Sequence, residues 1–167
     1  MGIITYKSRR DFISIINEHS FKRCAELGVA TGDFSSVLAK SKLTELVLVD
    51  KWNDHHNEAE QLVVIKRFAK DSRIKIFHEL FSKAVNRFPD EYFDFIYIDG
   101  YAHTGQDSGL TLALWWPKVR IGGFFGGHDY HMRFKPTINV VDEFCKKYDK
   151  ELYTTEEDTF PSWYVFK

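Results

Sequence analysis

The sequence predicts an α/β domain built on a mostly parallel sheet, with helices on both faces and one antiparallel strand near an edge. Apolar runs rich in β-branched and aromatic residues alternate with amphipathic segments along the chain. Such runs, when helices separate them, are typical of a parallel sheet covered on both faces. The last two apolar runs leave no room for a helix between them, and a short connection requires antiparallel pairing.

The order of elements follows from periodicity and from turn residues. The expected strands are 23–27, 45–50, 73–78, 93–99 and 119–127, followed by two closing strands within 152–166. The expected helices are 9–19, 32–40, 54–70, 82–87, 106–116 and 137–148, of which the third is capped by Asp54. Neither a repeat nor a linker interrupts this order, so residues 1–167 are expected to form a single domain.

The composition indicates a packed globular protein. Apolar residues make up 44% of the chain and aromatic residues 16%, which is more than disordered chains carry. The 23 Lys and Arg balance 24 Asp and Glu, giving a net charge of −1, so stable nucleic-acid binding is not expected. No apolar run has the length of a membrane span or the pattern of a signal peptide. Cys24 and Cys145 are unpatterned, and we expect buried thiols in a reducing, cytoplasmic compartment.

Acidic residues follow most of the predicted strands, at the edge where open α/β sheets bind ligands. The residues at these strand ends include Glu26, Asp50, Asp99, His128 and Asp129. A ligand bearing phosphates would be repelled at this edge, whereas ammonium, sulfonium and hydroxyl groups would be attracted.

A glycine turn follows the first strand, in the sequence ELGVATGDFS. Its spacing differs from the G-x-G-x-x-G pattern of dinucleotide-binding proteins, which disfavours an NAD-dependent dehydrogenase. Gly28 permits a positive φ, and Gly32 allows the next helix to pack closely. We expect the amides of Ala30 and Thr31 to hold a carboxylate, and Asp50 to bind the hydroxyls of a ribose.

Three segments together resemble the class I S-adenosylmethionine-dependent methyltransferases: ELGVATGDFS, LVLVDKW and FDFIYIDGYAHTGQDSGLTLALWWPKVRIGGFFGGHDY. The third is most similar to macrocin O-methyltransferase and related sugar O-methyltransferases. The resemblance extends over about residues 20–145. It implies a Rossmann-like, seven-stranded, mostly parallel sheet and S-adenosylmethionine as the cofactor.

The resemblance also implies the cofactor contacts. Glu26 faces the amino group of the methionine part, which the glycine turn surrounds. Asp50 binds the ribose hydroxyls, the 80–81 segment lies against adenine, and Asp99 closes the methionine side. The implied set is Glu26, Gly28, Ala30, Thr31, Gly32, Asp50, Lys51, Leu80, Phe81 and Asp99.

Methyl transfer to oxygen needs a group that accepts the proton of the hydroxyl, and histidine suits this role near neutral pH. The resemblance implies His103 as the base, beside Asp99, although DGYAH is one residue longer than the family's pattern. His128 is the alternative base.

Several members of the resembled family bind a divalent cation that orients sugar hydroxyls. The matching positions here are Asp99, His128 and Asp129, so an imidazole replaces one carboxylate. A site for Mg or Mn and a metal-independent enzyme both remain open.

The sequence therefore predicts an O-methyltransferase that acts on a hydroxyl of a sugar, a glycan or another small molecule. A nucleic-acid methyltransferase and a noncatalytic cofactor-binding module are the alternatives on the same fold. An amino-methylating DNA enzyme would carry an Asn/Asp-Pro-Pro-aromatic motif where this chain has DGYA. No long insertion is available to form a lid, so we expect an open acceptor site, completed by a large acceptor, a second copy of the chain or a neighbouring domain.

Overall fold

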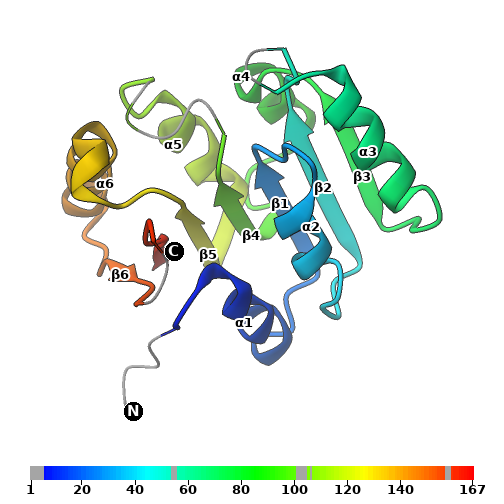
Figure 1. The fold of residues 1–167 in the computed structure, drawn as a ribbon. Helices are drawn as coiled ribbons and strands as arrows, with labels where there is room; N and C mark the ends of the chain where they lie inside the picture. The colour runs from blue at the N-terminus through cyan, green and yellow to red at the C-terminus, as the bar shows by residue number, and fades with distance from the viewer. Residues whose placement is uncertain (1–5, 54–55, 101–104, 106, 157–158) are drawn as a thin grey trace.

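The computed structural model describes residues 6–53, 56–100, 105, 107–156 and 159–167. Its seven-stranded sheet has the strand order β3-β2-β1-β4-β5-β7-β6 (Figure 1). The strands are β1 (Arg23–Leu27), β2 (Glu45–Asp50), β3 (Ile74–His78), β4 (Phe93–Ile98), β5 (Val119–Gly127), β6 (Tyr153–Thr154) and β7 (Trp163–Phe166). Strands β1 to β5 pair in parallel, and β7 is antiparallel to both β5 and β6. This confirms the predicted fold class.

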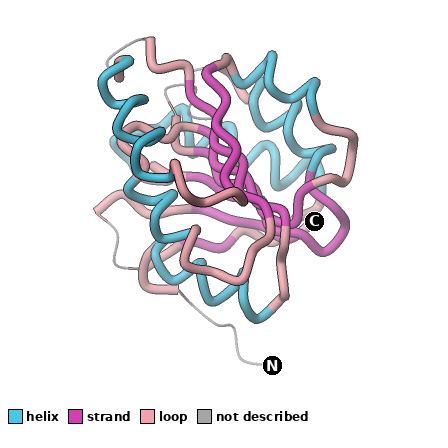
Figure 2. Tube along the Cα trace, turned by 90° about the vertical axis from the view of Figure 1, so that its right-hand side faces the viewer, coloured by secondary structure: helices cyan, strands magenta, loops and turns pink. Residues whose placement is uncertain are grey.

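Helices cover both faces of the sheet, as the side view in Figure 2 shows. One face carries α1 (Phe12–Glu18), α2 (Asp33–Leu38) and α3 (Glu58–Phe68). The other carries α4 (Phe81–Ala84), α5 (Leu110–Trp115) and α6 (Lys135–Tyr148). The residues that the structure describes also include four short 3-10 helices: η1 (Arg9–Asp11), η2 (Val85–Arg87), η3 (Trp116–Lys118) and η4 (Met132–Phe134).

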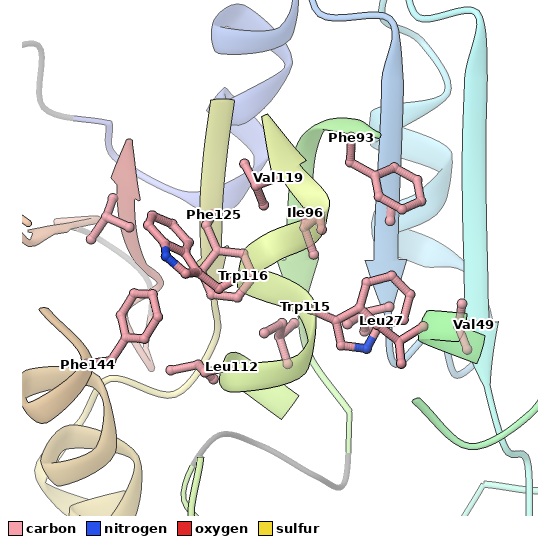
Figure 3. Close-up of a cluster of buried hydrophobic side chains, with 14 of the residues drawn as sticks. Leu27, Val49, Phe93, Ile96, Leu112, Trp115, Trp116, Val119, Phe125 and Phe144 are labelled. Carbon is pink, nitrogen blue, oxygen red and sulfur yellow. The ribbon is translucent and has the colours of Figure 1, made fainter. Parts of the chain in front are cut away.

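Each face of the sheet has its own aromatic-rich core, because successive side chains of a strand point to opposite faces. On β4, Phe95 belongs to the core under α1 and α2, whereas Ile96 belongs to the core under α5 and α6. Figure 3 shows the second core, in which Trp115 and Trp116 pack against the sheet. Both indoles are buried.

Two helices begin later than the sequence predicts, and a local feature explains each start. Asn57 caps α3 in a capping box with Glu60, whose carboxylate accepts the Asn57 N–H at 3.2 Å. The predicted cap, Asp54, lies outside the described residues. Helix α5 begins at Leu110 because Gly109, with φ of 82°, is in the left-handed region and interrupts the helix.

Within the described ranges, no helix is long and apolar enough to cross a membrane. Cys24 and Cys145 are buried free thiols, as predicted. Burial raises the pKa of the Cys145 thiol to about 11, so this side chain is unreactive near neutral pH.

Candidate functional site

The candidate site lies over the carboxyl ends of β1 and β4, the neighbouring strands at which the sheet order changes direction. Loops that leave such strands in opposite directions open a crevice between them. Here the two loops touch: a Cβ added to Gly28 would lie 2.2 Å from the Gly100 nitrogen. Gly28 also has a φ of 95°, so the close approach and the backbone conformation both require glycine.

The Asp50 carboxylate holds the loop that follows β1. Its Oδ2 accepts the N–H groups of Val29 at 2.7 Å and Ala30 at 3.0 Å, and its Oδ1 accepts that of Trp52 at 3.0 Å. The Trp52 indole in turn donates to the Ala30 carbonyl at 2.9 Å. The Ala30 amide, expected to hold a ligand carboxylate, donates to Asp50 in this structure.

An apolar compartment of the cleft, about 220 Å³ in volume, lies beside Asp50. Most of its surface is apolar, and the hydrophobic side chains in its wall come from α4, from α5 and from the turn before α4: Leu80, Phe81, Leu110 and Leu114. Four carboxyl groups also line it: Asp50, Glu79, Asp99 and Asp107. The Phe81 ring lies so close to Gly100 that a Cβ there would meet it at 2.4 Å. The predicted Lys51, Leu80 and Phe81 thus line one compartment with Asp50.

A polar compartment of about 300 Å³ adjoins the first. The two share Ala30, His56, Asp99 and Gly100 in their walls, so they form one continuous cleft. The charged side chains that line the polar compartment are Arg9, Glu26, Asp33, Asp99 and Asp129. Gly28 and Thr31 line it as well, whereas Gly32 packs against α3, with a built Cβ at 3.3 Å from Val64 and Phe68.

Glu26 is a buried carboxyl at the base of the polar compartment. Burial raises its pKa to about 8, although the Ser35 hydroxyl, which donates to Oε2 at 2.5 Å, works in the opposite direction. Near neutral pH the group is therefore largely protonated. A bound cation would lower its pKa again and turn it into a counter-ion.

Arg9 forms an ion pair with Asp99 across the polar compartment. Burial lowers the pKa of Arg9, but the charges and hydrogen bonds of Asp99 and Tyr97 together raise it overall. The guanidinium carbon lies 5.1 Å from the centre of the Phe34 ring, a cation–π contact. Arg9 is not among the residues that the sequence predicts, since η1 precedes β1 and no motif marks it.

His128 follows β5 and lies between two carboxylates. Its Nδ1 is 2.8 Å from Asp129 Oδ1 and 3.5 Å from Asp99 Oδ1. We assign the proton to Nδ1, because both neighbours are acceptors, which leaves Nε2 as the basic atom. His103, the base that the resemblance implies, lies outside the described residues.

The predicted metal site finds no support. Over the described part of the chain, no group of three or more His, Cys, Asp or Glu side chains is arranged to hold a metal ion. Asp99 instead pairs with Arg9, and Asp129 pairs with His128. These contacts use the ligand atoms on which a Mg or Mn site would depend.

Two further side chains lie at the cleft or support it. His56, expected inside a helix, precedes α3 and lines both compartments, with its Nδ1 2.8 Å from Glu60 Oε2. The sequence signal for this was Asn57, a capping residue that directly follows His56 and so places it before the helix. Trp52 is 1% exposed and supports the β1 loop through its hydrogen bond to the Ala30 carbonyl.

A family model described as a methyltransferase domain matches residues 25–130. This range includes the β1 loop, the ends of the strands that border both compartments, and the His128–Asp129 pair. No match to the chain was found among curated protein sequences.

Solved structures share the fold at low identity. One is a proposed caffeoyl-CoA O-methyltransferase from Staphylococcus aureus, with 15% identity, a TM-score of 0.78 and coverage of 99% of this chain and 86% of that one. A second is an O-methyltransferase from Bacillus cereus in complex with SAH, with 14% identity, a TM-score of 0.71 and coverage of 95% and 80%. A third is spermidine synthase from Thermotoga maritima, with 14% identity, a TM-score of 0.69 and coverage of 96% and 60%. The chain is similar to all three in fold.

Proposed function

Because the chain belongs to the family of methyltransferase domains, we propose that it transfers the methyl group of S-adenosylmethionine to a hydroxyl of a small molecule, a sugar or a glycan. The observation that carries this proposal is the division of one cleft into an apolar and an acidic compartment. S-adenosylmethionine has a flat, weakly polar base at one end and a sulfonium and an ammonium group at the other. The two compartments match these two ends.

The residues present fit the cofactor. The apolar compartment suits adenine, and Asp50 at its edge can accept a ribose hydroxyl at Oδ1, which accepts one amide from the described residues. Glu26 lies where the ammonium group would need a counter-ion, and its pKa would fall on binding. The touching glycines at positions 28 and 100 leave the cleft without side-chain bulk at its centre.

The bound cofactor supplies an electrophilic methyl group. The chain has to hold the acceptor hydroxyl in line with it and remove the proton as the new C–O bond forms and the S–CH₃ bond breaks. Nε2 of His128 would accept the proton that the acceptor hydroxyl loses, and Asp129 at Nδ1 would stabilise the imidazolium that results. His103 is the base that the resemblance implies. Substitution of each histidine in turn shows which of the two is the base.

Cofactor binding is tested by calorimetric titration with S-adenosylhomocysteine and, as a control, NAD. Binding of the first alone supports the proposal, and binding of neither contradicts it. Transfer is tested with a methyl-labelled donor and a panel of sugar nucleotides, methyl glycosides, catechols, DNA and RNA. Label in nucleic acid alone would favour the alternative of a nucleic-acid methyltransferase, and binding without any transfer would favour a noncatalytic module.

His128→Gln should lower the transfer rate by about 10²- to 10⁴-fold, the usual contribution of a general base, and should leave S-adenosylhomocysteine affinity unchanged. His131→Gln is the matched control, because His131 is exposed and its Nδ1 accepts the Arg133 N–H instead. If His103→Gln abolishes transfer and His128→Gln does not, the base is His103.

A further inference from the structure

The polar compartment contains four carboxyl groups and a single arginine. Within the described part of the chain, Arg9 is the one Lys or Arg in its wall, among Glu26, Asp33, Asp99 and Asp129. An anionic group could enter this acidic surrounding only beside Arg9. The methionine end of the methyl donor carries such a group, the α-carboxylate, beside its ammonium.

Three donors of the β1 loop that could compete for this role are already engaged. The amides of Val29 and Ala30 donate to Asp50, and the Thr31 hydroxyl donates to Asp33 at 3.1 Å. The Arg9 guanidinium, on η1, is therefore the positively charged donor in the described wall of this compartment that can meet a ligand carboxylate. That group has five N–H donors in a planar fork, so it can pair with Asp99 and with a ligand carboxylate together.

Arg9 is held in place by contacts from several directions. Ser8 caps η1 in a capping box with Asp11, and η1 lies beside α2 in the blue N-terminal part of Figure 1. The guanidinium also donates a hydrogen bond to the buried Tyr97 hydroxyl, which lies 2.7 Å from Ser162 Oγ. A side chain fixed in this way before the ligand arrives loses little freedom on binding.

Resting on the proposed function, we propose that Arg9 recognises the α-carboxylate of the donor's methionine end and that this contact makes the cleft select carboxylate-bearing adenosyl ligands. Adenosyl thioethers or sulfoniums that keep the amino group but lack the carboxylate are then disfavoured. Their ammonium group can pair with Glu26 or Asp99. These ligands have no carboxylate to pair with Arg9, so the guanidinium and the ammonium group repel each other.

The test is a calorimetric comparison of two ligands on four proteins. The ligands are S-adenosylhomocysteine and its decarboxylated analogue, which differ only in the carboxylate. The proteins are the wild type, Arg9→Met, Arg9→Lys and Arg10→Gln, the last being a control on the exposed neighbouring residue. The full chain is used, and far-ultraviolet circular dichroism and thermal unfolding are recorded for each variant.

We expect the wild type to prefer S-adenosylhomocysteine by about 10- to 100-fold, the range for one charge-assisted contact. Arg9→Met should lose this preference, Arg9→Lys should retain part of it, and Arg10→Gln should retain all of it. Equal weakening of both ligands in Arg9→Met would mean a purely structural role and would overturn the inference. So would an undiminished preference in Arg9→Met, which would leave the proposed function intact.

Failure of the wild type to bind S-adenosylhomocysteine at all would instead overturn the proposed function, and the inference with it. If Arg9→Met does not fold, Arg9→Lys decides the question alone. Its preference must then lie below that of the wild type and of Arg10→Gln. A Lys variant with full wild-type preference in that case contradicts a recognition role for the planar guanidinium fork.

Discussion

The apolar and polar compartments of the cleft are built in different ways. Hydrophobic side chains dominate the apolar compartment, and two of them, Leu80 and Leu110, are about half exposed, at 47% and 52%. Three carboxyl groups of the polar compartment have side-chain partners: Glu26 has Ser35, Asp99 has Arg9, and Asp129 has its neighbour His128. A half-exposed apolar wall discriminates weakly between ligands of similar shape. In a buried network of paired polar groups, by contrast, loss of one partner has a large effect on stability or binding.

The largest effect should follow from disrupting the junction of both compartments. Gly28→Ala would bring a Cβ to 2.2 Å from the Gly100 backbone at a φ of 95°, and we expect a loss of about 2–4 kcal/mol in the free energy of unfolding. Gly122→Ala is the control, because Gly122 also has a positive φ, of 75°, but nearly open space around it. That variant should lose only about 1 kcal/mol. If urea denaturation showed equal losses of stability for Gly28→Ala and Gly122→Ala, the predicted clash with Gly100 would be refuted.

Glu26 should make the stability of the protein depend on pH. Burial raises its pKa in the folded protein to about 8, from an ordinary value of 4.5. Between these values the native state binds a proton that the unfolded state has released, so stability falls as pH rises through this window. Glu26→Gln should remove this dependence, which is of order a few kcal/mol.

The measurement for Glu26 is urea denaturation of both proteins from pH 5 to pH 9. The wild type should weaken relative to Glu26→Gln as pH rises. Calorimetry at pH 7 in buffers of different ionisation enthalpy should also detect proton release on S-adenosylhomocysteine binding, and the variant should lack it. A stability difference that does not vary with pH would contradict the raised pKa.

Asp50 should matter even before a ligand binds. Asp50→Asn replaces one acceptor oxygen by an NH₂ group, so amides of the β1 loop lose their partner. We expect a loss of about 1–3 kcal/mol in the free energy of unfolding of the ligand-free protein, together with weaker S-adenosylhomocysteine binding. Amide hydrogen exchange at Val29 and Ala30 should accelerate. A variant that keeps full stability but binds S-adenosylhomocysteine weakly would mean that Asp50 contacts the ribose and does not stabilise the β1 loop.

The smallest effect should come from the apolar wall. Leu110→Ala removes part of a side chain that is 52% exposed and should weaken S-adenosylhomocysteine about fivefold, with stability nearly unchanged. Leu62→Ala is a matched control, because Leu62 on α3 is also 52% exposed but does not line the apolar compartment. Equal affinities of the two variants would mean that adenine does not lie against Leu110.

Much of the fold could be predicted, because it is encoded locally. The alternation of apolar and amphipathic segments determined the strands and most helices, and the short final connection determined the antiparallel strand. Helix starts were less predictable, since caps such as Asn57 and interruptions such as Gly109 act through single hydrogen bonds or dihedral angles. Of the site, acids at strand ends were visible because the ends of parallel strands meet at one edge.

The sequence by itself determined which residues stand at the binding edge: Glu26, Asp50, Asp99 and the His128–Asp129 pair. Only the tertiary structure decided how each is used. Arg9 reaches Asp99 across 90 residues of chain because α1 packs its Phe12 against the rings of Tyr97 and Phe124 on the sheet. Asp50 binds amides that follow a different strand. Periodicity depends on neighbours in sequence, whereas charge pairing depends on which surfaces the packed core brings together.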